Sequence, residues 1–282
     1  MIFYLFKKLL WVSGLGVFLL GYSVLIEPGQ LKIREVEFIS DKYQGPDLRI
    51  GLMTDIHINS LGVPPSRVTR LVKTLNAQNP DIVLLTGDFI AGHETRENRS
   101  DLFNRRIELG LENLELIKAP AFATIGNHDA YWDAKRVGTI LNDIGILILD
   151  NEAHQLDEIC LVGLADALTS KPDRSAYNGC DAGAPPLVLT HSPDAWPSFR
   201  NDSMLVVAGH THGGQVNLPF IGRRVNSVSL GAEHSYGISQ IAGVDMFVSA
   251  GVGTSILPIR FRAPPEIVIL ALRSSNRRVD RN

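Results

Sequence analysis

Short apolar runs that alternate with amphipathic helical stretches are the feature that most constrains this chain. Residues 48–54 form an apolar run of the length of a buried strand, and residues 66–79 then repeat apolar side chains at helical spacing before Pro80. The same succession follows twice more before residue 146. This order predicts an α/β protein. The second half adds further apolar runs, at residues 187–190, 204–208 and 266–272.

The composition sets the number of domains and excludes one class of partner. The chain has 282 residues, 45% of them hydrophobic, which is enough for a large buried core. Its formal net charge of −3 has the wrong sign for a surface that follows a nucleic-acid backbone, so no nucleic-acid partner is expected. We expect one domain over residues 48–274, with a connecting segment at 27–47 before it and a polar tail at 275–282 after it.

The first 26 residues contain a long apolar run. Residues 9–26 carry no charge and follow Lys7 and Lys8. As a helix, this run would be about 27 Å long, just enough to cross a hydrocarbon core of about 30 Å. The lysine pair suits the cytoplasmic end, so we expect a single-pass anchor with the rest of the chain outside the cytoplasm. A cleaved signal peptide and a buried globular helix are the alternatives.

Cys160 and Cys180 are the two cysteines of the chain. In an oxidising compartment they could form a disulfide that closes a loop of about 20 residues. They could equally be two free thiols. The sequence does not decide between these states.

Side chains that can bind metal ions directly follow five of the apolar runs. Because ligand sites form at the carboxyl ends of the strands in open α/β sheets, side chains from distant parts of the chain can meet there. Imidazole and carboxylate groups suit divalent ions such as Mn²⁺, Fe²⁺ and Zn²⁺, and the lack of thiolates in these motifs argues against a structural zinc site. The residues are Asp55 and His57, Asp88, Asn127 with His128 and Asp129, His191, and His210 with His212.

In their order, these motifs resemble those of the calcineurin-like metallophosphoesterases. That pattern is Asp-x-His, Gly-Asp, Gly-Asn-His-Asp, a lone histidine and Gly-His-x-His, and the resemblance extends over residues 48 to about 272. It implies a β-sandwich of two mixed sheets flanked by helices, the αββα arrangement. It also implies a centre for two divalent metal ions, of which Mn²⁺ is favoured over Fe²⁺ and Zn²⁺.

The resemblance implies a role for each residue of the centre. His128 would contact the phosphoryl oxygen or protonate the leaving group, and Asp129 would orient the His128 imidazole. Asp88 would bridge the two metal ions. The first ion would be bound by Asp55, His57, Asp88 and His212, and the second by Asp88, Asn127, His191 and His210.

The implied activity is hydrolysis of a phosphodiester or pyrophosphate by a hydroxide held between the two metal ions. A phosphomonoesterase with the same centre and a catalytically inactive metal-binding membrane scaffold are the alternatives. His93, which follows the Asp88 motif closely, is expected to be a solvated or structural histidine unless it touches substrate.

Residues 251–262 bear on the substrate and the location. This stretch looks like the tail of membrane-associated bacterial phosphodiesterases, including enzymes similar to UDP-2,3-diacylglucosamine pyrophosphatases. The likeness implies a phosphate-ester substrate that could be a lipid or nucleotide-lipid. Together with the apolar run in residues 1–26, the likeness gives the bacterial inner membrane as the expected place, and the lysine pair puts the catalytic domain on the extracytoplasmic face.

Overall fold

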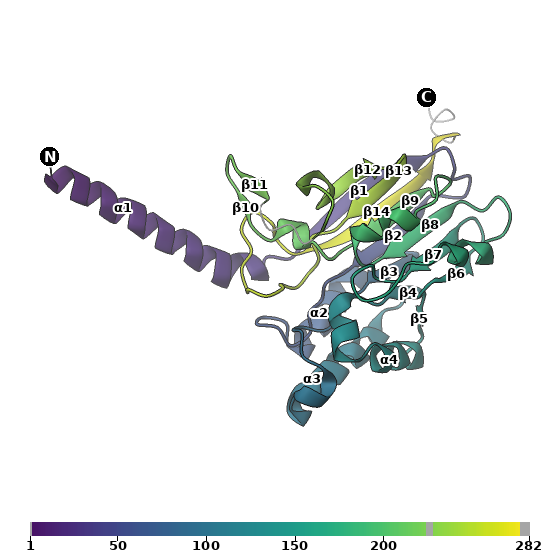
Figure 1. Cartoon of the computed structure of the whole chain (residues 1–282), viewed down its shortest axis with the longest axis horizontal. Coiled ribbons are helices and arrows are strands. Elements are labelled where there is room, and N and C mark those ends of the chain that lie inside the picture. Colours follow the sequence, from purple (N-terminus) through teal and green to yellow (C-terminus); the bar gives the residue numbers. More distant parts are fainter. Residues whose placement is uncertain (1, 224–227, 277–282) are drawn as a thin grey trace.

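The computed structural model of the protein describes residues 2–223 and 228–276. Residues 277–282, most of the expected polar tail, lie outside the described part. The core of the molecule is a sandwich of two six-stranded mixed sheets (Figure 1). The prediction of an α/β fold with two mixed sheets is confirmed.

The first sheet has the strand order β1-β14-β2-β3-β4-β5. The strands from β2 to β5 are parallel neighbours, β14 is antiparallel to β2, and β1 is parallel to β14. Its strands are β1 (Lys32–Ser40), β2 (Leu48–Met53), β3 (Ile82–Thr86), β4 (Ala121–Thr124), β5 (Ile146–Ile148) and β14 (Glu266–Ser274).

The second sheet has the strand order β12-β13-β9-β8-β7-β6. Its centre, from β13 to β7, is parallel, and the outermost strands β12 and β6 are antiparallel to their neighbours. A short separate hairpin joins β10 (Asn217–Leu218) to β11 (Gly222–Arg223). The strands of the sheet are β6 (Glu152–Gln155), β7 (Cys160–Leu164), β8 (Pro186–Thr190), β9 (Leu205–Ala208), β12 (Gly237–Ile241) and β13 (Val244–Val248).

Helices cover the outer face of the first sheet. Val68 and Leu71 of the first of these helices and Val137 of the last point into a buried cluster against this sheet, as the helical spacing predicts. The helices are α2 (Pro65–Asn76), α3 (Asp101–Glu112) and α4 (Asn127–Asp143). The outer face of the second sheet packs instead against two 3₁₀ turns, Arg174–Gly179 and Pro193–Ser198. A separate apolar cluster fills the space between the sheets.

β1 falls within residues 27–47, which the sequence analysis treats as a connection. The structure makes it an edge strand, paired with β14 along all nine residues from Lys32 to Ser40. Its sequence alternates charged residues with buried ones such as Val36 and Phe38, because one face of the strand is wet. A strand of this kind has no continuous apolar run, and such runs are the sequence pattern from which the other strands were predicted.

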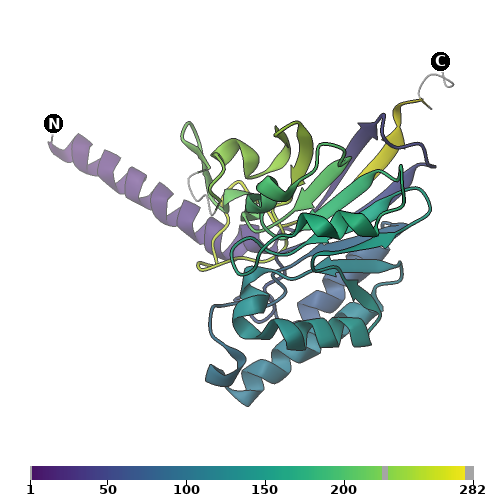
Figure 2. The same ribbon diagram turned by 45° about the vertical axis from the view of Figure 1, so that its right-hand side comes forward.

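α1 (Ile2–Gly21) extends away from the sandwich (Figures 1 and 2). The chain after it is tied to the domain: the amide of Arg260 donates to the carbonyl of Ser23 over 3.0 Å, and the amide of Ala263 donates to the buried Glu27 carboxylate over 2.8 Å. Within the described residues, none of the helices is both long and apolar enough to be a membrane-spanning candidate.

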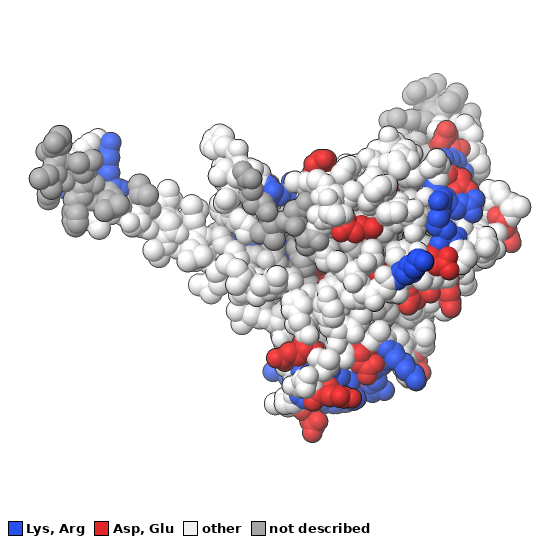
Figure 3. All heavy atoms as spheres, viewed as in Figure 1, with Lys and Arg blue, Asp and Glu red and all other residues white. Residues whose placement is uncertain are grey.

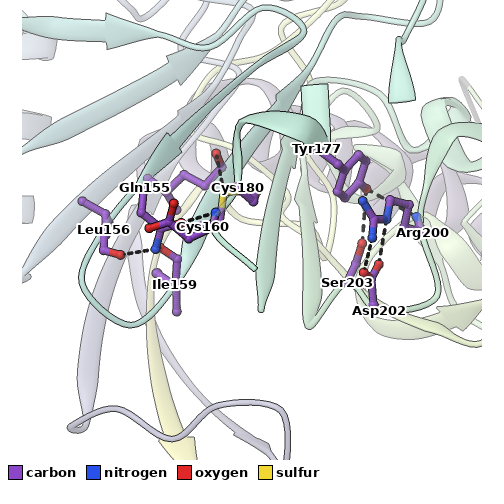
Figure 4. The surroundings of a disulfide bond; sticks show 11 residues. Gln155, Leu156, Ile159, Cys160, Tyr177, Cys180, Arg200, Asp202 and Ser203 are labelled. Carbon is purple, nitrogen blue, oxygen red and sulfur yellow. Dashed lines mark hydrogen bonds and ion pairs between the residues drawn. A yellow bond between two sulfur atoms is a disulfide. The ribbon is translucent and has the colours of Figure 1, made fainter. Parts of the chain in front are cut away.

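Cys160 and Cys180 form a disulfide, with 5.5 Å between their Cα atoms. Figure 4 shows this bond where β7 meets the turn that follows Arg174–Gly179. The bond closes a loop of 20 residues. The two cysteines are therefore paired and not free thiols, a choice that the sequence left open.

Candidate metal centre

Five strands deliver all seven predicted metal ligands to one edge of the sandwich. The first sheet supplies Asp55 and His57 after β2, Asp88 after β3, and Asn127 after β4. The second sheet supplies the remaining histidines after β8 and β9. Because the parallel strands of both sheets end at the same edge, residues separated by more than a hundred positions meet. The ligands from the second sheet are His191, His210 and His212.

One group of possible ligands forms around Asp55. The Nε2 atoms of His57 and His212 lie 3.0 Å apart, and the Nε2 atom of His212 lies 3.4 Å from Oδ1 of Asp55. Oδ2 of Asp88 lies 3.7 Å from Nε2 of His57. These are the four residues expected for the first ion.

A second group forms around His191. Its Nε2 atom lies 3.2 Å from Oδ2 of Asp88, 3.1 Å from Oδ1 of Asn127 and 3.1 Å from Nδ1 of His210. These are the residues expected for the second ion. The Asp88 carboxylate is the group that the two clusters share.

Hydrogen bonds on the far side of the rings decide which nitrogen atoms face the centre. Nδ1 of His57 lies 3.2 Å from the carbonyl of Ile90, and Nδ1 of His191 lies 2.7 Å from the carbonyl of Thr86. A carbonyl accepts only, so each Nδ1 carries the hydrogen and each Nε2 points at the centre. Nε2 of His57 thus directs a lone pair toward the ring of His212. A cation fits between such converging lone pairs, so the donor set suits two divalent ions.

The backbone at the centre is strained. Five of the seven predicted ligands have positive φ angles, between 49° and 68°, which non-glycine residues rarely adopt. Such conformations cluster at functional sites, where surrounding structure holds them in place. The strained residues are Asp55, His57, Asp88, His210 and His212.

Glycines of the motifs leave room for the carboxylates. A β carbon on Gly126 would lie 2.3 Å from both the amide nitrogen and Oδ1 of Asp88, and one on Gly209 would lie 2.5 Å from Oδ2 of Asp55. These contacts are too short for any side chain. The glycines are therefore required by space, because two chain segments pass close to each ligand.

Burial and neighbouring charges distribute protons within the centre. Burial raises the pKa of Asp55 to about 7. Burial opposes ionisation of Asp88 as well, but the charge and hydrogen bond of His191, together with the charges of His57 and His128, outweigh it and lower the pKa of Asp88. For His191 burial lowers the pKa, but the charge and hydrogen bond of Asp88, with the charges of Asp55 and Asp166, together raise it to about 10. Burial lowers the pKa of His57 to about 3. At neutral pH His191 and Asp88 form an ion pair, and His57 is neutral.

His128 lies beside the two clusters at the start of α4. Its Nε2 atom is 3.8 Å from Oδ2 of Asp88 and 3.5 Å from the hydroxyl of Ser255. Its Nδ1 atom is 2.7 Å from the carbonyl of Gly92, which takes the orienting position expected for Asp129. The Asp129 carboxylate instead accepts from the amides of Gly126 and Ile90, at 2.9 and 3.1 Å. Gly126 directly precedes α4 and Ile90 belongs to the loop after Asp88, so the Asp129 carboxylate ties the start of the helix to that loop.

A cavity of about 250 Å³ lies over the centre. His128 and His93 line it, and their rings are 4.4 Å apart, so His93 is placed where it can touch a substrate. Ser255 and Ile256 line it from the loop before β14. Both residues lie within the stretch 251–262 that the sequence analysis relates to the substrate, but only the path of that loop shows that they reach the centre.

Two mixed sheets with a buried carboxylate shared by two histidine clusters define the class of dimetal hydrolases. The family model described as "Calcineurin-like phosphoesterase" matches residues 48–249. The chain belongs to this family of metal-dependent phosphoester hydrolases.

Known proteins extend the comparison along the whole chain. An uncharacterized metallophosphoesterase of Helicobacter pylori strain J99 is 32% identical over 276 residues, which cover 94% of this chain and 70% of that protein. Phosphodiesterase YaeI of Escherichia coli K12 is 28% identical over 264 residues, which cover 89% of this chain and 92% of that protein. A solved dimetal phosphatase from Danio rerio is 14% identical with a TM-score of 0.45, over 74% of this chain and 88% of that one.

Proposed function

We propose that this protein is a dinuclear metal-dependent phosphodiesterase that hydrolyses a phosphodiester or pyrophosphate bond. The single observation that carries the proposal is the Asp88 carboxylate, which lies within 3.7 Å of His57 in one cluster and 3.2 Å of His191 in the other. The name of the Escherichia coli relative, a phosphodiesterase, supports the choice of diester over monoester. Mn²⁺ is the proposed metal, because carboxylate and amide oxygens occur with imidazoles in the donor set.

The residues of the chain divide the work around the metals. Asp55, His57, Asp88 and His212 would hold one ion, and Asp88, Asn127, His191 and His210 the other. Two bound cations supply a hydroxide nucleophile and neutralise charge on the phosphoryl oxygens. The amide of His210 donates to both oxygens of Asp55 at 3.0 Å, and the amide of His128 donates to Oδ1 of Asp88 at 2.9 Å, so both carboxylates are held before substrate arrives.

His128 is the proposed general acid. The carbonyl of Gly92 accepts from its Nδ1, so Nε2 is the atom that faces the cavity. In the proposed step His128 starts doubly protonated, against a burial that lowers its pKa. The proton on Nε2 passes to the leaving oxygen as the bond from phosphorus to that oxygen breaks. Such proton transfer contributes about 10²- to 10⁴-fold to a rate. Asp129 acts indirectly, by fixing the first turn of α4.

We further propose that the substrate is lipid-linked and that α1 contacts a membrane. Ile256 and Leu257, beside the centre, are 86% and 57% exposed, and Trp11 of α1 is 80% exposed. Figure 3 shows acidic and basic side chains gathered along the edge far from α1 and around α3, whereas the face near the domain end of α1 has few. Exposed apolar side chains on a face with few charges are typical of a surface that contacts lipid or protein.

The proposed location is the extracytoplasmic face of a bacterial inner membrane. The Cys160–Cys180 disulfide supports this side, because disulfides persist in oxidising compartments. Protease added to intact spheroplasts should then digest the domain. Digestion only after lysis would contradict the location.

Hydrolysis of bis-p-nitrophenyl phosphate tests the activity. The Mn²⁺-loaded protein should hydrolyse this diester faster than p-nitrophenyl phosphate, and a chelator should abolish the activity. Asp88→Ala should lower kcat by at least about 100-fold, since it removes the shared ligand. Asp143→Ala, a change of the same kind at the exposed end of α4, should leave the rate within about twofold.

Two results would overturn the proposal. A faster rate on the monoester would favour a phosphomonoesterase. A metal-loaded protein that is inert on a broad panel of phosphate esters would favour a metal-binding scaffold. Presenting a diester on a lipid in mixed micelles tests the lipid part, since a rate no higher than that of a water-soluble diester would argue against it.

A further inference from the structure

A second and larger cavity opens beside the one over the metal centre. Its volume is about 620 Å³, against about 250 Å³ for the cavity over the centre. The two cavities share His93, Ser255 and Ile256 as walls, and His57 of the metal centre lines the larger one. A substrate held at the metals can therefore extend from one cavity into the other.

Arg99 lines the larger cavity, and two nitrogen atoms of its guanidinium lack hydrogen-bond partners among the described residues. Its side chain is 4% exposed, and its Nε and Nη1 atoms have no hydrogen bond within the part of the chain that the structure describes. The carboxylate of Glu94, which is 72% exposed and also lines the cavity, forms an ion pair with Arg99 at 3.8 Å from Nε, beyond hydrogen-bond distance. Phe103 covers one face of the guanidinium at 4.3 Å. Buried charged donors without acceptors are costly, so such a group in a cavity wall indicates a missing anionic partner.

Ser60 presents a second polar group without a partner to the same cavity. Its hydroxyl oxygen is buried and makes no hydrogen bond to any residue described. Ser60 follows the Asp55–His57 motif, whereas Arg99 comes from the segment before α3, so the two groups reach the cavity independently. The rest of the wall is mixed: apolar side chains such as Leu61 and Leu257 alternate with polar ones, among them Thr254 and the carboxylate of Glu94.

Contacts connect Arg99 to the proposed general acid. Gly92 accepts from Nδ1 of His128, and a β carbon on Gly92 would lie 2.4 Å from Nη2 of Arg99. The guanidinium therefore packs against the same residue that orients His128. A group bound by Arg99 would lie on the side of the centre from which His128 protonates the leaving oxygen.

We infer that the larger cavity binds the leaving-group arm of the substrate, and that Arg99 and Ser60 recognise a second oxyanion on that arm, a phosphoryl or carboxylate group close to the scissile phosphate. The planar fork of arginine matches either group. The apolar side chains of the wall, Leu61 and Leu257 among them, would contact the carbon chain or ring that follows. This inference rests on the proposed phosphodiesterase function for the direction of the arm, and its binding test does not require turnover.

Binding of small anions to the Mn²⁺-loaded protein tests the inference by calorimetry. The probes are orthophosphate, pyrophosphate and phosphonoacetate. Arg99→Gln should weaken pyrophosphate binding by about 10- to 100-fold, because a charge-assisted hydrogen-bonded pair is lost, and leave orthophosphate within about threefold. An equal loss for phosphonoacetate would show that a carboxylate serves as well, and a loss for pyrophosphate alone would identify a phosphoryl group.

Two further variants keep the test independent of folding. Ser60→Ala removes a hydroxyl that has no partner among the described residues, so it should leave the melting temperature unchanged while weakening pyrophosphate binding by about 3- to 10-fold. Arg96→Gln is the matched control, because Arg96 pairs with Glu108 and does not line the cavity. This variant should change the affinity for neither orthophosphate nor pyrophosphate.

Other outcomes would overturn the inference. Equal weakening of orthophosphate and pyrophosphate by Arg99→Gln would mean that Arg99 acts only through Gly92 and His128. Unchanged binding of all three probes in both Arg99→Gln and Ser60→Ala would exclude an oxyanion site. If the wild-type protein is inert on diesters while Arg99→Gln still weakens pyrophosphate binding selectively, the proposed function is refuted and this site is retained.

Discussion

The Nε2 atoms of His57 and His212 lie 3.0 Å apart although 155 positions separate the two residues. Nδ1 of His57 is engaged with the carbonyl of Ile90, so its Nε2 faces the other imidazole as a lone pair. Nδ1 of His212 is buried and has no hydrogen bond among the residues described. A divalent cation between the two imidazoles would accept both as ligands. The affinity of the centre for this cation should depend on pH, because ligands that carry a proton must release it when the cation binds.

Metal affinity is expected to fall as the pH drops below 7. The pKa of Asp55, raised by burial to about 7, means that this carboxyl holds a proton at pH 6 that a metal ion must displace. His191, whose pKa is raised to about 10 by Asp88, gives up its proton at either pH. We expect about two protons released on metal binding at pH 6 and about one at pH 8.5, counted by calorimetry in buffers of different ionisation enthalpy.

Asp55→Asn is the control for this pH dependence. It removes the carboxyl that titrates near neutral pH and should reduce the release at pH 6 to about one proton, at the cost of weaker binding. Equal proton release at pH 6 and 8.5 in the wild-type protein would contradict the prediction.

Adding a single methyl group at Gly126 should disrupt the centre. Because the new β carbon would lie 2.3 Å from the Asp88 backbone and carboxylate, Gly126→Ala must displace the shared ligand. We expect metal affinity to fall by at least about tenfold, measured by titration, with a matching loss of activity.

Gly138→Ala in the same α4 helix provides the matched comparison. A β carbon there has no atom within 4 Å, so metal affinity should stay the same and stability should rise by up to about 1 kcal/mol. If both alanine variants bound metal like the wild type, crowding at Gly126 would not be what positions Asp88.

Removing the disulfide should lower stability without changing the metal centre. The bond closes a loop of 20 residues, and loops of this size contribute about 3 kcal/mol in the chain-entropy model. Cys160→Ala/Cys180→Ala should lose about this free energy of unfolding in urea titrations. Cys160 pairs with Pro186 at the start of β8, whereas His191 follows its end, so metal affinity should not change. A loss of metal binding in the folded double variant would show that the two regions are coupled.

The strand–helix order and most of the centre could be predicted from the sequence. β2, β3 and β4 lie within a residue or two of their apolar runs, because a buried parallel strand needs apolar side chains on both faces. The seven ligands stand directly after strands, where the ends of a sheet place side chains together. The family resemblance implied that Asp88 and His191 share an ion, and the structure places their side chains 3.2 Å apart.

Residues without a local signal could not be predicted in this way. β1 is half wet and lacks an apolar run, and Gly92 orients His128 through a backbone carbonyl that any residue has. Arg99 and Ser60 are marked only by the absence of hydrogen-bond partners among the described residues, which no sequence pattern reveals.

The sequence by itself determined the chemical types of the ligands and the strand ends on which they stand, since both depend on residues close together in the chain. The tertiary structure decided which atoms meet: it placed the Gly92 carbonyl, rather than Asp129, behind His128, joined Cys160 to Cys180, and set Arg99 in a cavity beside the centre. These contacts depend on the paths of loops between distant strands, and such paths are fixed only when the whole chain packs.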